Sequence, residues 1–231
     1  HPDRFVERAE NEWPLARTQW TKYYLDPAGA SLTTTPPAAN ARLDYAALGD
    51  GLLFLTPPFE EETEFTGPVA AKLFVSSSTR DADLFLVLRV FAPDGSEVTF
   101  RGSNDPRVPV GLGWLRASQR KLDAKESKPY RPLHTHDEHQ PLTPNVPVEL
   151  DIEIWPTSIV VPKGHRIAFT VRGRDYEYDG TDAGVAHAPY PMKGVGPFTH
   201  THPQDRPAKI FGGKNTLHFA KGKMPYVLLP V

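Results

Sequence analysis

Hydrophobic and polar residues alternate along many short stretches of this chain, which is the pattern of β-strands with one buried and one solvated face. Between Val148 and Ile154 every even-numbered position is aliphatic and every odd-numbered position is acidic. The pattern therefore predicts that Leu150, Ile152 and Ile154 point into a core. Their neighbours Glu149, Asp151 and Glu153 should point to solvent.

A second type of strand is apolar almost throughout. The run Leu84–Phe91 suits a strand that is buried on both faces, and the turn residues of Ala92–Ser96 separate it from a short strand at 97–100. Further strands are predicted at 17–25, 51–56, 69–76, 112–120, 166–172, 214–219 and 225–229.

Proline and glycine strengthen the all-β prediction. The 231 residues include 25 prolines and 17 glycines, and proline interrupts helices while it is tolerated at strand ends and turns. We therefore expect an all-β fold, a jelly-roll (galactose-binding-like) two-sheet sandwich with long irregular loops. Residues 1–231 should form this single domain, with 1–16 as a linker-like segment.

One long loop stands out between 179 and 207, because it is rich in Gly, Pro and His and lacks periodicity. A loop of this length inside one domain is usually functional or forms an interface. We expect an interface role for His200, His202 and Asp205.

Charge and hydropathy exclude several classes of partner. The formal net charge of −2 gives no electrostatic reason to expect nucleic acid or an anionic membrane. No apolar run approaches the roughly 18 residues needed to span a bilayer. The chain begins without methionine, which suggests a piece of a longer protein. The lack of cysteine excludes disulfides, and the cytoplasm is the favoured compartment.

The segment LHTHDEHQPL, residues 133–142, contains three histidines and two carboxylates. His134 and His136 have the two-residue spacing of metal ligands on a strand, as in cupins. The cupin pattern also needs a glycine and a glutamate where this chain has Lys128 and Gln140 or Pro141. We therefore expect a polar loop, with no metal and no cofactor.

Two acidic stretches resemble cation sites only in part. Asp175–Gly180 begins like a calcium loop, but its twelfth position is Ala186 rather than glutamate, so an acidic surface turn is expected. Asp81 and Asp83 precede the most apolar strand and are expected to cap backbone amides in the turn.

A catalytic serine is not evident in the sequence. No serine lies in a G-x-S-x-G turn, and a cysteine nucleophile is impossible in a chain without cysteine. We therefore expect no catalytic residue in this chain.

Several motifs in order carry a resemblance to a known family. They are EWPLART (12–18), GLLFLTPP (51–58), TGPVAAKLFVSSS (66–78), GWLRASQR (113–120), IWPTS (154–158) and KGHR (163–166). The chain resembles the C-terminal domain of X-Pro dipeptidyl-peptidases and cocaine-esterase-like serine hydrolases, from about residue 12 to its last residue.

The resemblance implies that an upstream α/β-hydrolase domain of the same polypeptide carries the catalytic triad and is the partner of this domain. It also implies that Leu53 and Phe54 line the acyl pocket of that enzyme, although core packing explains these two residues equally well. A homo-oligomer is left open.

A different class is a stand-alone carbohydrate-binding jelly-roll module. The aromatic residues Trp13, Trp20, Tyr23 and Tyr24 could form a sugar-stacking surface, although such residues are more often core. A G-x-S-x-G domain upstream in the native reading frame would favour the hydrolase.

Overall fold

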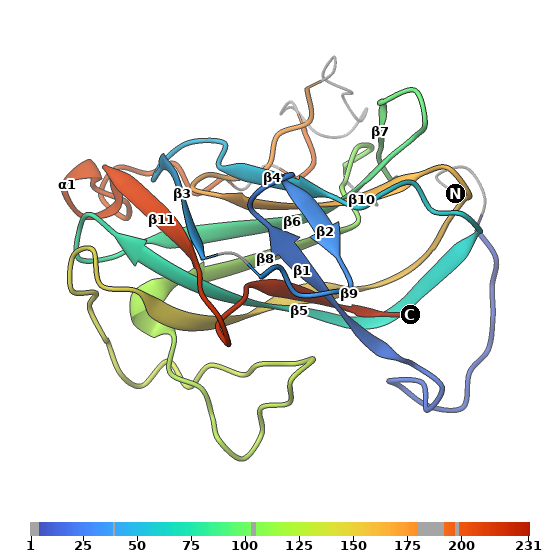
Figure 1. Ribbon diagram of the computed structural model, residues 1–231, viewed down its shortest axis with the longest axis horizontal. Helices are drawn as coiled ribbons and strands as arrows, with labels where there is room; N and C mark the ends of the chain where they lie inside the picture. Colours follow the sequence, from blue (N-terminus) through green and yellow to red (C-terminus); the bar gives the residue numbers. More distant parts are fainter. Residues whose placement is uncertain (1–4, 39, 103–104, 180–191, 197–198) are drawn as a thin grey trace.

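Strands make up almost all of the regular structure in the computed structural model, which describes residues 5–38, 40–102, 105–179, 192–196 and 199–231 (Figure 1). The only helical turns in these ranges are η1 (Ala117–Gln119) and α1 (Ala208–Phe211). The strands in chain order are β1 (Trp20–Asp26), β2 (Ser31–Thr33), β3 (Ala41–Ala46), β4 (Leu52–Leu55), β5 (Thr63–Ser77), β6 (Asp83–Phe91), β7 (Glu97–Val98), β8 (Gly111–Arg116), β9 (Val148–Val161), β10 (Arg166–Arg172), β11 (Lys214–Phe219) and β12 (Tyr226–Pro230).

The two longest strands, β5 and β9, form an antiparallel pair along one layer. Their register runs from Thr63 opposite Val161 to Val75 opposite Val148, with a shift between Gly67 and Val69. The other edge of β5 pairs with β12 and then with β11, and β3 follows β11. This layer therefore contains the chain's closing strand at its centre.

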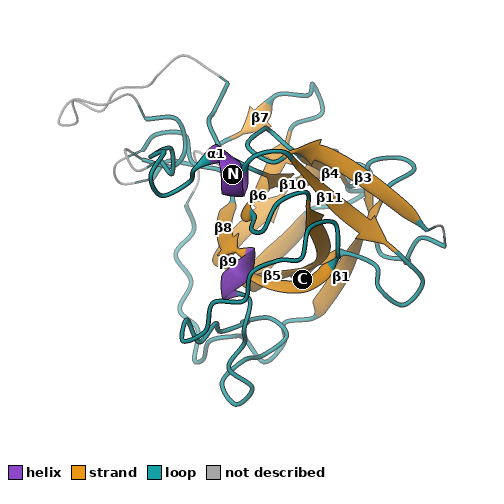
Figure 2. Ribbon diagram, turned by 90° about the vertical axis from the view of Figure 1, so that its left-hand side faces the viewer, coloured by secondary structure: helices purple, strands orange, loops and turns teal. Residues whose placement is uncertain are grey.

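The second layer contains β4, β10, β6 and β8 in that order, with β7 also on β6. Strands β12, β1 and β2 continue the hydrogen bonding from the first layer to β4, so one sheet curls round to form both layers. Figure 2 shows β8 and β9 beside each other where this curl almost closes. The all-β sandwich is thus confirmed.

Close approach of β8 to β9 depends on glycine. A Cβ atom at Gly113 would lie 2.4 Å from the Glu153 carbonyl oxygen, and one at Gly111 would lie 3.2 Å from that of Trp155. A larger residue at 113 would therefore push the two strands apart.

The core lies between the two layers. Leu150, Ile152 and Ile154 are fully buried, as the alternation predicted, and Glu149 and Glu153 are exposed. Asp151 is half-buried because its carboxylate pairs with Lys72. The largest core side chains are aromatic or leucine and include Phe54, Phe65, Phe169, Leu73 and Leu86.

The sequence patterns did not predict two of the strands, and they predicted the wrong length for several others. The short edge elements β2 and β3 were not predicted, and β5 and β9 extend well beyond the predicted 69–76 and 148–154. The strand predicted at 97–100 covers only Glu97–Val98, and the one predicted at 112–120 ends at Arg116.

Residues 5–14 form neither helix nor strand. Arg8 holds this segment to the sandwich through two hydrogen bonds to the Glu64 carboxylate, of 3.0 and 2.6 Å. No helix in the described ranges has the length and hydropathy needed to cross a bilayer.

Candidate functional site

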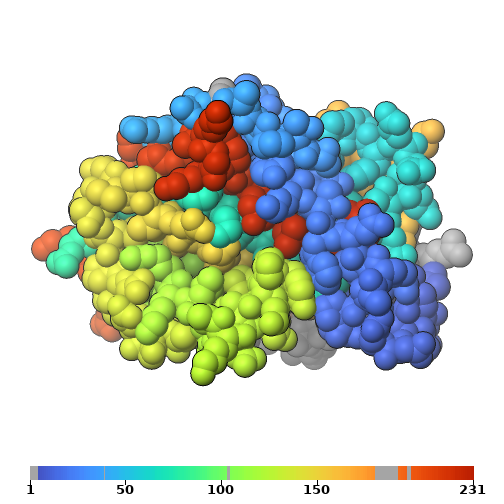
Figure 3. Space-filling view, turned by 60° about the horizontal axis from the view of Figure 1, so that its bottom comes forward, coloured from blue at the N-terminus to red at the C-terminus, as the bar shows by residue number. Residues whose placement is uncertain are grey.

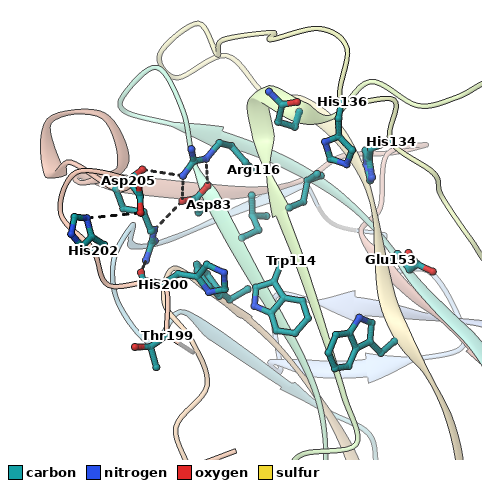
Figure 4. Close-up of a pocket in the computed structure, with 16 residues that line it drawn as sticks. Asp83, Trp114, Arg116, His134, His136, Glu153, Thr199, His200, His202 and Asp205 are labelled. Atoms are coloured by element: carbon teal, nitrogen blue, oxygen red, sulfur yellow. Dashed lines mark hydrogen bonds and ion pairs between the residues drawn. The ribbon is translucent and has the colours of Figure 1, made fainter. Parts of the chain in front are cut away.

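A pocket of about 480 Å³ lies outside the core, where β6, β8 and β9 meet the segment 199–206 (Figure 4). Its floor is formed by outward-facing residues of the three strands, and the segment 199–206 forms one wall. The pocket size is within the range of about 300–1,000 Å³ that is typical of small-molecule sites.

A row of aromatic rings crosses the floor of this pocket. Phe85 and Trp114 are opposite each other on β6 and β8, and the Trp155 ring meets the Trp114 ring edge to face with centroids 5.2 Å apart. The His200 ring lies 5.6 Å from Phe85 and 6.5 Å from Trp114. Trp155, at the open end of the row, is 60% exposed.

Asp83 connects the strands to the loop wall. Its carboxylate accepts two hydrogen bonds from Arg116, of 2.8 and 3.0 Å, and a third from Arg206 Nε at 2.9 Å. Arg206 also donates to the Gly173 and His200 carbonyl oxygens. The hydrogen bond from Arg116 to Asp83 raises the pKa of the Arg116 guanidinium.

Two further buried aspartates hold the same loop. Asp175 accepts hydrogen bonds from the His200 backbone N–H at 2.6 Å and makes a 3.1 Å contact with His200 Nδ1. Asp105 accepts from the backbone N–H groups of Gly194 and Gly196 at 2.7 and 3.0 Å. The acidic surface turn predicted at 175–180 is therefore wrong for Asp175, which is buried because it binds the loop.

The predicted capping role is confirmed for Asp81 only. Asp81 Oδ1 accepts from the backbone N–H groups of Ala82 and Ser118, at 2.9 and 3.0 Å. Asp83 pairs with two arginines instead, because its side chain lies on the outer face of β6 beside them.

The three histidines of LHTHDEHQPL differ in environment. His134 is half-buried, and desolvation lowers the pKa of its imidazole, whereas His136 and His139 are exposed. The His134 and His136 rings are 6.1 Å apart and both border the pocket. The described ranges contain no group of three or more His, Cys, Asp or Glu side chains arranged to share a metal ion.

The structure brings together the three residues predicted for the loop. The side chains of His200, His202 and Asp205 all line the pocket and are 57%, 63% and 81% exposed. Their interface role is not tested by these contacts and stays a prediction.

Leu53 and Phe54 lie elsewhere, on β4. Phe54 is fully buried and faces the core beside Phe219, with ring centroids 6.5 Å apart. Leu53 is half-buried, so of these two residues it is the one with side-chain surface that a neighbouring domain can contact. The acyl-pocket role stays a prediction.

Sequence reasoning did not single out Trp114, Trp155, Arg116 or Arg206 as site residues. Trp155 follows Glu153 on the outward side of β9, and a large aromatic residue at a solvent-facing strand position is a usable signal. The arginines gave no such signal because their partner Asp83 is distant in sequence.

One serine–histidine contact lies outside this pocket. Ser76 Oγ is 2.7 Å from His218 Nε2, and burial lowers the pKa of His218, so the imidazole is neutral at pH 7. Ser76 is only 3% exposed and lies within β5, opposite Thr216 of β11, rather than on an exposed turn. The contact is therefore a cross-strand hydrogen bond of a buried serine.

Comparison with known proteins gives a family match over nearly the whole chain. The family is described as the X-Pro dipeptidyl-peptidase C-terminal non-catalytic domain, and residues 3–227 match it.

Two curated relatives are "Putative serine esterase Mb1866c" of Mycobacterium bovis and "Putative serine esterase MT1883" of Mycobacterium tuberculosis. Each is 30% identical over 129 residues, which is 54% of this chain and 19% of the relative. The chain therefore spans about a fifth of the length of these proteins.

Solved structures show the same fold. A CocE/NonD family hydrolase from Staphylococcus aureus superposes with a TM-score of 0.81 at 23% identity, covering 96% of this chain and 38% of that one. An aminopeptidase from a marine sediment archaeon, Thaumarchaeota archaeon, gives 0.65 at 17% identity, covering 95% and 38%. An α-amino acid ester hydrolase gives 0.57 at 19% identity, covering 92% and 36%.

Proposed function

Because the chain belongs to the family of X-Pro dipeptidyl-peptidase C-terminal non-catalytic domains, we propose that it is the accessory β-sandwich of a serine hydrolase. In this proposal it packs on an α/β-hydrolase domain of the same polypeptide, which supplies the nucleophile, the base and the oxyanion donors. The observation that carries the proposal is the family match over residues 3–227 in a chain that spans only 19% of its curated relatives.

The N-terminal segment supports a packing surface. Phe5, Val6 and Trp13 are 77%, 76% and 55% exposed, an unusual concentration of uncovered large side chains in nine residues. Figure 3 shows the N-terminal residues, in dark blue, at one end of this face of the molecule. Since Arg8 and Glu64 fix the segment to the sandwich, a partner that covers these side chains would be held in a defined orientation.

The acyl-pocket role belongs to the same proposal. Leu53 offers a half-buried side chain at the surface of β4, and Phe54 supports it from the core. In the native polypeptide, Leu53→Ala should change the selectivity among acyl groups of activated esters by about tenfold, while its melting temperature shifts little. Equal losses for all acyl groups would contradict the pocket role.

Hydrogen exchange tests the packing. Amides of residues 5–14 should exchange rapidly in the isolated chain and at least about tenfold more slowly in the native polypeptide, since burial under a neighbouring domain closes them to solvent. The matched control is the exposed segment 136–139. Equal exchange of 5–14 in the two proteins would contradict packing at this surface.

A stand-alone carbohydrate-binding module is less well supported, because the family match and the share of the relatives that the chain covers both favour an accessory domain. Whether the domain binds a sugar does not depend on whether it exists as a separate protein.

A further inference from the structure

The pocket between β6, β8, β9 and the segment 199–206 has two unlike sides. Figure 4 shows His200, Thr199, Arg116 and Asp205 on one side of Trp114, and Glu153, His134 and His136 on the other. The two sides differ in how far their polar groups are already occupied.

On the loop side, the strong charges are already paired. Asp83 binds both Arg116 and Arg206. The other two nitrogens of Arg206 donate to backbone carbonyl oxygens, and Arg116 Nη2 also donates to the Asp205 carbonyl oxygen. An anionic ligand would have to break the pair with Asp83 to reach the Arg206 guanidinium, which is only 9% exposed, and this costs more than a surface ion pair returns.

On the other side, polar groups are unoccupied. In the described part of the chain the Glu153 carboxylate and the Gln119 amide, which both line the pocket, make no hydrogen bond or ion pair. Together they offer a hydrogen-bond acceptor and an amide that can both donate and accept. These groups suit a ligand with several hydroxyls and no net charge.

Between the two sides lies the exposed aromatic surface. Trp114 and Trp155 meet at 67°, which leaves ring faces open at the pocket mouth rather than closed into a cage. A flat apolar face with polar groups around its edge matches the C–H face and the peripheral hydroxyls of a sugar ring.

We propose that this pocket binds a neutral pyranose, with the sugar ring stacked on the exposed Trp155 beside Trp114 and its hydroxyls bound by Glu153 and Gln119. Asp175 orients His200, which closes the far end of the aromatic row. The proposal does not rest on the hydrolase function, because every group that it uses belongs to this chain.

Titration of the chain with maltose, cellobiose and lactose tests the site, followed by tryptophan fluorescence and ligand-observed NMR. At least one sugar should bind saturably with a Kd in the millimolar range. Sorbitol, which has hydroxyls but no ring face, should not saturate.

Two tryptophans provide a matched pair of variants, since Trp155 is 60% and Trp13 is 55% exposed. Trp155→Ala should weaken sugar binding at least about tenfold, and Trp13→Ala should leave it unchanged. Glu153→Gln should weaken it by a smaller factor. Melting temperatures of the three variants should equal that of the parent chain, because all three side chains are exposed.

Several results would overturn the proposal. One is that none of the three sugars saturates the chain. Another is that Trp155→Ala binds the sugar as tightly as the parent chain does. A third is displacement of the sugar by choline, which would indicate a cation site. Loss of binding in the native full-length polypeptide would also overturn it, because the pocket would then be covered by a neighbouring domain.

Discussion

The interior of the sandwich and the loop wall of the pocket are held by different kinds of contact. In the interior, Leu150, Ile152 and Phe169 are fully buried among other apolar side chains, and no specific partner is needed. At the loop wall, Asp83 and Asp175 are buried carboxylates that bind arginine, histidine and backbone N–H groups. Burial is similar in the two regions, but the chemistry that compensates for it is not.

The two kinds of contact have different effects: one mainly stabilises the fold, and the other mainly fixes the shape of the pocket. Apolar burial contributes most of the free energy of folding and tolerates small shifts, because it has no direction. A buried carboxylate contributes less net stability, since its desolvation offsets much of the attraction, but it fixes the groups around it. We therefore expect core changes to lower the free energy of unfolding and carboxylate changes to alter the pocket.

The largest expected effect is in the core. Ile152→Ala should lower the free energy of unfolding by about 2–5 kcal/mol, because it removes fully buried methylene and methyl groups and leaves a cavity. Denaturant unfolding measures this, with the hydrogen exchange of 199–206 expected to stay at the parental level once global unfolding is accounted for.

The neighbouring position on the same strand is the control. Asp151→Ala removes a half-exposed ion pair with Lys72 and should cost only about 0.5–1 kcal/mol. A larger loss for Asp151 than for Ile152 would mean that the register of β9 is wrong.

The intermediate effect is at the loop wall. Asp83→Asn should cost about 2–3 kcal/mol, because the amide accepts fewer hydrogen bonds and leaves the guanidinium of Arg206 without its charge partner. Its distinctive result should be faster hydrogen exchange at 199–206 than in the Ile152→Ala variant, even if the two variants have similar free energies of unfolding.

Asp205→Asn is the matched control, since this carboxylate is 81% exposed. It should change stability by less than about 0.5 kcal/mol and leave the loop protected. Unchanged loop exchange in Asp83→Asn would show that the carboxylate does not hold the wall.

The smallest effect concerns the N-terminal segment. The hydrogen bonds from Arg8, with that of the Thr66 hydroxyl, lower the pKa of Glu64 to about 2 from its ordinary 4.5. A lowered folded-state pKa means that the attachment is fully present above about pH 4.5 and is lost as the pH falls toward 2. NMR signals of residues 5–14 should therefore sharpen in this window, as the segment detaches, before the core unfolds.

The Glu64→Gln variant should release the segment at every pH and show no such window. A parental pH dependence in this variant would mean that another group holds the segment, such as Glu10, which also contacts Arg8.

Alternation predicted the strands whose two faces differ, because β9 between 148 and 154 exposes one side and buries the other. The strand predicted from this pattern ended before Pro156, although β9 continues to Val161. The strand predicted at 69–76 began too late, because Gly67 and Pro68 are typical of a strand break. The register shift between Gly67 and Val69 lets β5 continue through them. The short strand β2 has too few residues for periodicity to be visible.

The site was only partly predictable. Composition and length identified the loop with His200, His202 and Asp205. The network that positions it joins Asp83 to Arg206 across 123 positions and Asp175 to His200 across 25. Such pairs depend on the tertiary arrangement of β6, β10 and the loop, which a single sequence does not encode locally.

Labelling with a serine-directed fluorophosphonate is the most direct test of whether this domain carries any nucleophile. Intact-mass measurement of the purified chain should show no stoichiometric adduct, while the native polypeptide should gain one adduct on a serine outside residues 1–231. Ser76→Ala provides the control, because Ser76 contacts a histidine and should be as unreactive as the other serines. Stoichiometric labelling of the isolated chain would contradict the assignment of a non-catalytic domain if the label is lost when Ser76, or any other single serine, is replaced by Ala.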